Sequence, residues 1–208
     1  MKIAEKYFDG LKDAYCSRGG IDEWRPFERA IRGISDENKS ELMKVFPDIP
    51  ESLIDLLRRV DGTYWRKYLK GEVAFYILAS DVDDGEYPYY LYSSQQMIDQ
   101  KHVSYNDDFA DLIGSYLEDM ENERGLFVDE KIRIDGAPLL WLCFSDCMNN
   151  GSVSSLYIDF TPSDKGVKGQ IIRYLQDPEE LRVIADSFDE YLEKIIEKEY
   201  AFIREEDF

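Results

Sequence analysis

The chain has a single histidine, His102, and only three cysteines, Cys16, Cys143 and Cys147, among its 208 residues. Three cysteines cannot form a disulfide framework, so the sequence predicts a reduced, cytoplasmic protein. No hydrophobic run approaches the length of a membrane span, and the first fifteen residues contain no apolar core of a signal peptide. These absences argue against a secreted or membrane-embedded protein, and we expect no membrane partner.

Motifs for catalysis and cofactor binding are also missing. The chain has no G-x-S-x-G sequence and no phosphate-binding G-x-x-x-x-G-K-[ST] loop. Cys143 and Cys147 have no second pair of zinc ligands, and the acidic segment after Asp81 has its glycine, Gly85, one position too early for an EF-hand. We therefore expect no catalytic residue, no cofactor and no metal site. A metal-dependent enzyme that uses clustered carboxylates stays a third hypothesis.

Basic residues are few, because 25 Lys and Arg stand against 44 Asp and Glu, which gives a net charge of −19. Such a negative field repels nucleic acid, so we expect no nucleic-acid partner. The excess is concentrated between Asp81 and Asp135, where fifteen acidic and four basic residues give −11. A basic partner protein would be attracted to this region. A solvated acidic surface explains the same composition.

Hydrophobic residues make up 44% of the chain, which is enough for a packed core. Apolar residues at helical spacing predict four helices in the first sixty residues. The first spans Ile3 to Tyr15, the second 22–34, the third begins at Ser35 or Asp36, and the fourth follows Pro50 and ends at Gly62. A further helix is predicted over 107–122, from the spacing of its apolar residues.

Strands are predicted where β-branched and aromatic residues are bounded by Gly, Pro, Asn or Asp. The expected strands are 73–79, 86–93, a short arm within 126–135, and the runs PLLWLCF, SLYIDF and GQIIRYL near the C-terminus. Ser187 and Glu190 fit a capping box ahead of a last amphipathic helix. This order predicts a single α+β domain, in which an antiparallel β-sheet is flanked by N-terminal helices, an inserted helix and a C-terminal helix.

Two segments resemble the SUKH superfamily, which includes the yeast cell-wall glucan-synthesis regulators and many bacterial immunity proteins. The first, FPDIPESLIDLLRRVDG, has a helix between a proline and an Asp-Gly pair. The second contains, in the order of the family, Trp141, the turn Asn149-Asn150-Gly151, SLYIDF with Thr161-Pro162, the loop Gly166-x-x-Gly169, QIIRYL and VIADSFDEYL. We divide the SUKH-like domain, 1–208, into a helical extension (1–45), a family-like core (46–92 and 136–197) and an acidic helical insert (93–135).

The resemblance implies a protein-binding module without enzymatic activity. Many bacterial relatives neutralise a toxin of a polymorphic or contact-dependent system, and such toxins are often nucleases with basic surfaces. The leading hypothesis is therefore an immunity protein that blocks a cognate basic toxin by steric and electrostatic occlusion. The alternative, implied by the eukaryotic relatives, is a regulatory scaffold for a cell-wall or signalling protein.

Acidic and tyrosine-rich segments supply the predicted contacts with this partner. Tyr87 and Tyr89 share one face of the strand EYPYYLY, and aromatic side chains beside carboxylates are typical of protein-binding surfaces. Packing in the core explains the same rings. The predicted partner-binding residues, chosen from charge and expected exposure, are Asp83, Asp84, Glu86, Tyr87, Tyr89, Asp107, Asp108, Glu118 and Glu121.

Overall fold

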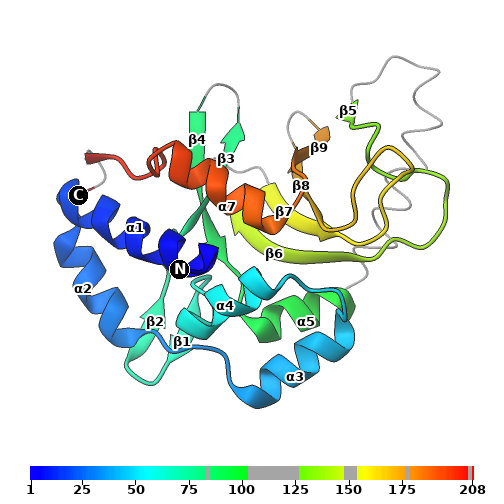
Figure 1. The fold of residues 1–208 in the computed structure, drawn as a ribbon. Helices are drawn as coiled ribbons and strands as arrows, with labels where there is room; N and C mark the ends of the chain where they lie inside the picture. The colour runs from blue at the N-terminus through cyan, green and yellow to red at the C-terminus, as the bar shows by residue number, and fades with distance from the viewer. Residues whose placement is uncertain (83–84, 103–126, 148–153, 177–178, 206–207) are drawn as a thin grey trace.

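Helices form the first quarter of the chain in the computed structural model, which describes residues 1–208 apart from 83–84, 103–126, 148–153, 177–178 and 206–207 (Figure 1). Ser35 caps one of them by accepting a hydrogen bond from the N–H of Asn38 at 3.1 Å, which satisfies a donor left open at the helix start. All four expected helices are present: α1 Ile3–Ser17, α2 Ile21–Ala30, α3 Asp36–Val45 and α4 Glu51–Arg59.

Two β-sheets follow, and neighbouring strands are antiparallel with one exception. A short hairpin is formed by β1 Arg66–Tyr68 and β2 Gly71–Val73. The main sheet, over the described ranges, has the order β3-β4-β6-β7-β8-β9-β5, and only β9 and β5 run parallel. Its strands are β3 Leu78–Val82, β4 Gly85–Leu91, β5 Phe127–Val128, β6 Trp141–Cys147, β7 Ser154–Asp159, β8 Gln170–Gln176 and β9 Glu179–Ala185. The predicted α+β class is confirmed.

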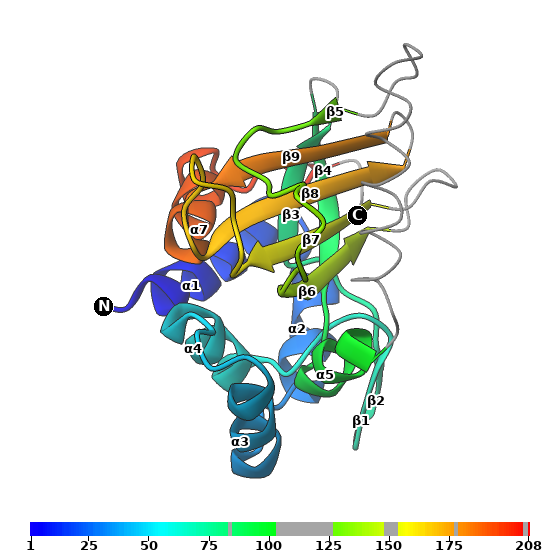
Figure 2. The same cartoon turned by 90° about the vertical axis from the view of Figure 1, so that its right-hand side faces the viewer.

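The last helix, α7 Phe188–Glu197, packs on the main sheet, and α1 packs beside it (Figure 1). The ring of Phe144 on β6 meets Phe188 and Tyr191 of α7 edge-on, with centroids 5.4 and 5.8 Å apart. Helix α5, Ser94–His102, lies between α3 and β6. The segment that joins β5 to β6 crosses the sheet in front of β8 in Figure 2, and its Ile132 is buried. These contacts join the layers through one hydrophobic core.

The predicted capping box at the start of α7 is present in part, because one of its two hydrogen bonds goes to a neighbouring residue. Ser187 Oγ accepts a hydrogen bond from the N–H of Glu190 at 3.1 Å. The Glu190 carboxylate accepts at 2.7 Å from the N–H of Asp186, one residue before the cap. One open donor of this helix start, the Glu190 N–H, is therefore satisfied as the S-x-x-E pattern predicts, whereas the reciprocal bond of Glu190 goes to the residue before the cap.

Three local predictions differ from the structure or lie outside it. The segment 73–79, predicted as one strand, is interrupted between β2 and β3, where the carbonyls of Tyr76 and Ile77 accept hydrogen bonds from the hydroxyls of Tyr15 and Tyr7 on α1. Strand β9 was not predicted, and its end Val183–Ala185 was expected to lead into the last helix. The helix predicted over 107–122 lies outside the described residues.

Candidate functional site

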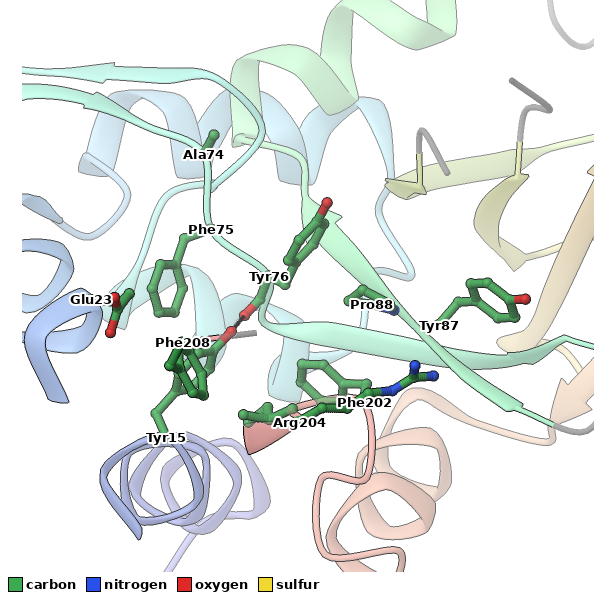
Figure 3. A pocket seen from close by; sticks show the side chains of 11 residues that line it. Tyr15, Glu23, Ala74, Phe75, Tyr76, Tyr87, Pro88, Phe202, Arg204 and Phe208 are labelled. Atoms are coloured by element: carbon green, nitrogen blue, oxygen red, sulfur yellow. Dashed lines mark hydrogen bonds between the residues drawn. The ribbon is translucent and has the colours of Figure 1, made fainter. Parts of the chain in front are cut away.

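A cleft with a volume of about 560 Å³ opens beside β4, where distant parts of the chain meet. Helices α1 and α2, the segment between β2 and β3, β4, and the segment after α7 each contribute to it (Figure 3). Its lining consists mainly of aromatic and apolar side chains: Tyr15, Glu23, Ala74, Phe75, Tyr76, Tyr87, Pro88, Phe202, Ile203, Arg204 and Phe208.

Tyrosines on α1 position the wall of the cleft that lies between β2 and β3. Tyr7 and Tyr15 are eight residues apart, so they lie on the same face of the helix. The Tyr15 hydroxyl donates a hydrogen bond of 2.8 Å to the carbonyl of Tyr76, and the Tyr7 hydroxyl donates to the carbonyl of Ile77. These two bonds fix the backbone at Tyr76 and Ile77 against α1, and the side chains of Phe75 and Tyr76 line the cleft.

One end of the cleft is a packed aromatic cluster. The Phe75 ring stacks on Phe27 of α2 with centroids 4.1 Å apart and an angle of 7° between the planes. Tyr15 lies 4.7 Å from the same Phe75 ring and 5.8 Å from Phe208. Aromatic pairs at these distances contribute beyond their buried area. Figure 3 shows Glu23 at this end, and Tyr87 with the Arg204 guanidinium at the other.

The segment after α7 forms the last wall of the cleft. Arg18, at the C-terminal end of α1, fixes this segment. The guanidinium of Arg18 donates hydrogen bonds to the carbonyls of Glu199, Tyr200 and Ile203, at 2.6, 2.7 and 3.1 Å. Tyr200 is buried, donates to the carbonyl of Tyr7 at 2.9 Å, and has its pKa raised by that burial. This segment therefore belongs to the folded body, although it lies about 180 residues from its partners.

Tyr87 and Tyr89, which the sequence places on one strand face, have different surroundings. Tyr87 is half-buried and lines the cleft, beside Pro88. Tyr89 is fully buried, its hydroxyl is hydrogen-bonded to Ser154 on β7, and burial raises its pKa. The prediction that Tyr89 contacts a partner is therefore wrong, because the strand carries it from the hairpin end into the core.

Glu86 lies in β4 opposite Asp81 of β3, at the hairpin end of the strand pair. The other acidic residues predicted to bind the partner lie outside the described residues, and their role stays a prediction. These are Asp83, Asp84, Asp107, Asp108, Glu118 and Glu121.

Asp146 on β6 is a half-buried carboxylate paired with the buried Tyr92, and neither residue lines the cleft. The Tyr92 hydroxyl donates a 2.7 Å hydrogen bond to Asp146, and burial raises the pKa of the Asp146 carboxyl. Burial also raises the pKa of the Cys143 thiol to about 12, so this side chain packs as a small buried hydrophobe. Among the described residues, no group of three or more His, Cys, Asp or Glu side chains could hold a metal ion. No helix in that part is long and apolar enough to cross a membrane.

Sequence reasoning missed most of the cleft. Phe75 and Tyr76 were assigned to a strand, and Phe202 and Phe208 to no element. The aromatic residues after α7, in EYAFIREEDF, are the one sequence signal that could have indicated a folded segment there. The cleft lining offers aromatic faces with one carboxylate and one guanidinium, a set suited to holding a side chain of a partner.

A sequence model of the SMI1 / KNR4 family (SUKH-1) matches residues 33–194, which is more than half of the chain. The match includes β3, β4 and the segment between β2 and β3, whereas Tyr15, Glu23 and Phe202–Phe208 lie outside it. No curated protein sequence matches the chain.

Proposed function

Because the chain belongs to the SMI1/KNR4 family (SUKH-1), we propose that it is a non-enzymatic protein-binding module that acts as an immunity protein. It binds a cognate toxin with a basic surface, such as a nuclease, and prevents the toxin from reaching its substrate. The observation that carries this proposal is the open aromatic cleft beside the acidic β3–β4 hairpin. The net charge of −19 supports a basic partner.

The mechanism is occlusion, in which the two parts of this surface have different roles. The carboxylates of Asp83, Asp84 and Glu86 attract the basic partner and accelerate its approach, because complementary fields mainly raise association rates. The cleft then receives a side chain of the partner against Tyr87 and Phe75. An arginine or lysine side chain suits these rings, since cations bind to aromatic faces.

The alternative is a regulatory scaffold that binds a cell-wall or signalling protein. It is favoured by the family description, which names SMI1 and KNR4. In that case the same cleft would bind a partner that is not toxic, and the affinity would not depend on a basic surface.

The experiment begins by isolating the partner with the purified protein as bait and eluting with salt. The partner is then purified, and its association rate is measured by stopped-flow at low and physiological salt. The variant Asp83→Lys/Asp84→Lys should slow association several-fold at low salt, with a smaller effect at high salt because the ions screen the field. The matched control is Glu37→Lys/Glu41→Lys, which makes the same charge change on exposed positions of α3, at the far end of the molecule (Figure 1).

Toxicity and affinity decide between the two functions. For an immunity protein, the partner alone arrests growth when expressed, co-expression restores growth, and Tyr87→Ala weakens both binding and protection. A harmless partner would favour the scaffold. Equal association rates for the hairpin and α3 variants would contradict the assignment of the hairpin as the electrostatic contact.

A further inference from the structure

The β1–β2 hairpin exposes two large apolar side chains. The indole of Trp65 retains 56% of its accessible surface, and Leu69, at the turn, is fully exposed. The hairpin projects from the end of the molecule opposite the β3–β4 hairpin (Figures 1 and 2). Trp65 precedes β1 at the base of the hairpin and Leu69 lies at its turn, so exposed apolar groups stand at both ends of one short strand. Exposed large apolar groups on one element indicate a contact with another molecule more often than a gain in folding.

The same hairpin is a basic point on a strongly acidic chain. Arg66, Lys67 and Lys70 lie within it, and Glu72 is its one acidic residue. Arg66 is engaged within the chain, because its guanidinium donates to Asp61 at 3.0 Å and lies 5.8 Å from the centre of the Tyr68 ring. Lys67 and Lys70 are exposed, and neither forms an ion pair with a carboxylate of the described residues. Their side chains are therefore available to an acidic partner, although Lys67 lies opposite Glu72 in the strand pairing, which offsets part of its charge.

The backbone at Trp65 adds an independent observation. Its φ is +48°, in the left-handed region that is uncommon for a bulky residue. Such a conformation costs free energy, and it persists where the surrounding structure holds it. Here the hydroxyl of Tyr68 donates to the carbonyl of Gly62 at 2.8 Å, and Asp61 accepts from the N–H of Ser94 at 2.8 Å. The base of the hairpin is thus fixed, while Trp65, whose backbone is strained, keeps its indole exposed.

The hairpin also has open strand edges. In the described part of the chain, β1 and β2 pair with each other and with no further strand. Unpaired backbone groups at such an edge accept an added extended segment, whose side chains then contact the neighbouring pockets and charges.

We propose that the β1–β2 hairpin binds an extended acidic polypeptide segment that carries apolar side chains. Lys67 and Lys70 bind its carboxylates, Trp65 contacts an apolar residue at the base of the hairpin, and Leu69 contacts another at the turn. None of these four side chains lines the cleft, and the inference does not rest on the proposed function.

The test starts with a display library of random peptides selected against the immobilised full-length protein. Peptides that also bind the Lys67→Gln/Lys70→Gln variant are removed. Both lysines are exposed, so the substitutions do not disturb the core. The peptides that remain are synthesised, and their binding is followed by tryptophan emission. Trp24 and Trp141 are buried, at 0% and 4% exposure, so Trp65 dominates the response to a ligand.

The proposal expects acidic peptides with apolar residues, a blue shift of the Trp65 emission, and roughly tenfold weaker binding to Lys67→Gln/Lys70→Gln. Leu69→Ser should also weaken binding. The control Lys6→Gln/Lys44→Gln, which removes two exposed charges elsewhere, should bind as the wild type does. The proposal is overturned if no peptide depends on the hairpin, or if the dependent peptides are basic or uncharged. It is also overturned if phosphatidylserine vesicles shift the Trp65 emission and no peptide does, which would indicate a membrane contact.

Discussion

Replacing Gly62 by alanine tests how the chain is fixed between α4 and the hairpin base. Gly62 has a φ of +92°, and a Cβ built on it would lie 2.5 Å from the backbone nitrogen of Ser93 and 2.6 Å from its Cα. Those neighbours are held on both sides, because Thr63 donates to the carbonyl of Leu91 at 2.7 Å and Asp61 accepts from Ser94. Neither segment can move away from the added methyl group without breaking such a bond.

Two costs combine in Gly62→Ala. A left-handed backbone costs a residue with a Cβ about 1–2 kcal/mol. Forcing a methyl group into a filled space costs about 1–3 kcal/mol. The loss of unfolded-chain entropy offsets roughly 0.5–1 kcal/mol of this. We therefore expect Gly62→Ala to lower the free energy of unfolding by roughly 2–4 kcal/mol, a large part of the stability of an ordinary domain.

Gly169 provides a matched control, because its φ is +93° and nothing lies within 4 Å of a Cβ built there. Gly169→Ala therefore has the backbone cost alone, and we expect a loss of roughly 1 kcal/mol or less. Urea denaturation of the two variants, followed by circular dichroism, measures both values. Equal losses would show that Ser93 yields to the methyl group, and that the close packing of Gly62 does not constrain this turn.

Two further predictions concern the half-buried carboxylate of Asp146 and the last wall of the cleft. Burial raises the pKa of Asp146 above its ordinary value of 3.8, so its contribution to stability is complete below that pH and is lost as the pH rises through the folded-state pKa. Asp146→Asn should make the melting temperature fall less steeply as the pH rises, in a series of thermal melts across pH. An unchanged pH profile would show that Asp146 does not cause the loss of stability. Arg18→Ala removes three charge-assisted hydrogen bonds to the segment after α7, and should lower the free energy of unfolding by about 1–3 kcal/mol. It should also weaken partner binding at the cleft, and full retention of affinity would separate that segment from the site.

The elements that could be predicted from sequence are those with local signals. Ser35 and Ser187 cap their helices through residues three positions later, and these spacings are visible in the sequence. The strand β9 had no such signal. It begins with two glutamates, and its apolar end Val183–Ala185 runs into a helix, so its pairing with β8 decides its conformation. Strand formation of this kind depends on the neighbouring strand more than on the segment itself.

The candidate site could be predicted only in part, because its geometry comes from bonds that span most of the chain. The same acidic and aromatic pattern predicted that Tyr87 and Tyr89 both contact a partner. Tyr87, nearer the hairpin end, is half-buried, whereas Tyr89, two residues further along the strand, is fully buried. The carbonyl of Tyr76 is held by a tyrosine 61 residues away. Alternation along a strand gives the face of a side chain, and the packed layers decide whether that face is open.

The distribution of charge predicts how salt affects binding at each of the two proposed surfaces. A chain with a net charge of −19 has long-range repulsion from any acidic partner, whereas the β1–β2 hairpin provides a short-range attraction at one end. Salt at physiological strength screens the repulsion beyond roughly 8 Å, but leaves a direct contact between Lys67 and a carboxylate. Binding at the hairpin should therefore become stronger as salt rises from low values, and binding of a basic partner at the β3–β4 hairpin should become weaker. Opposite salt responses at the two ends would show that each surface recognises its own partner.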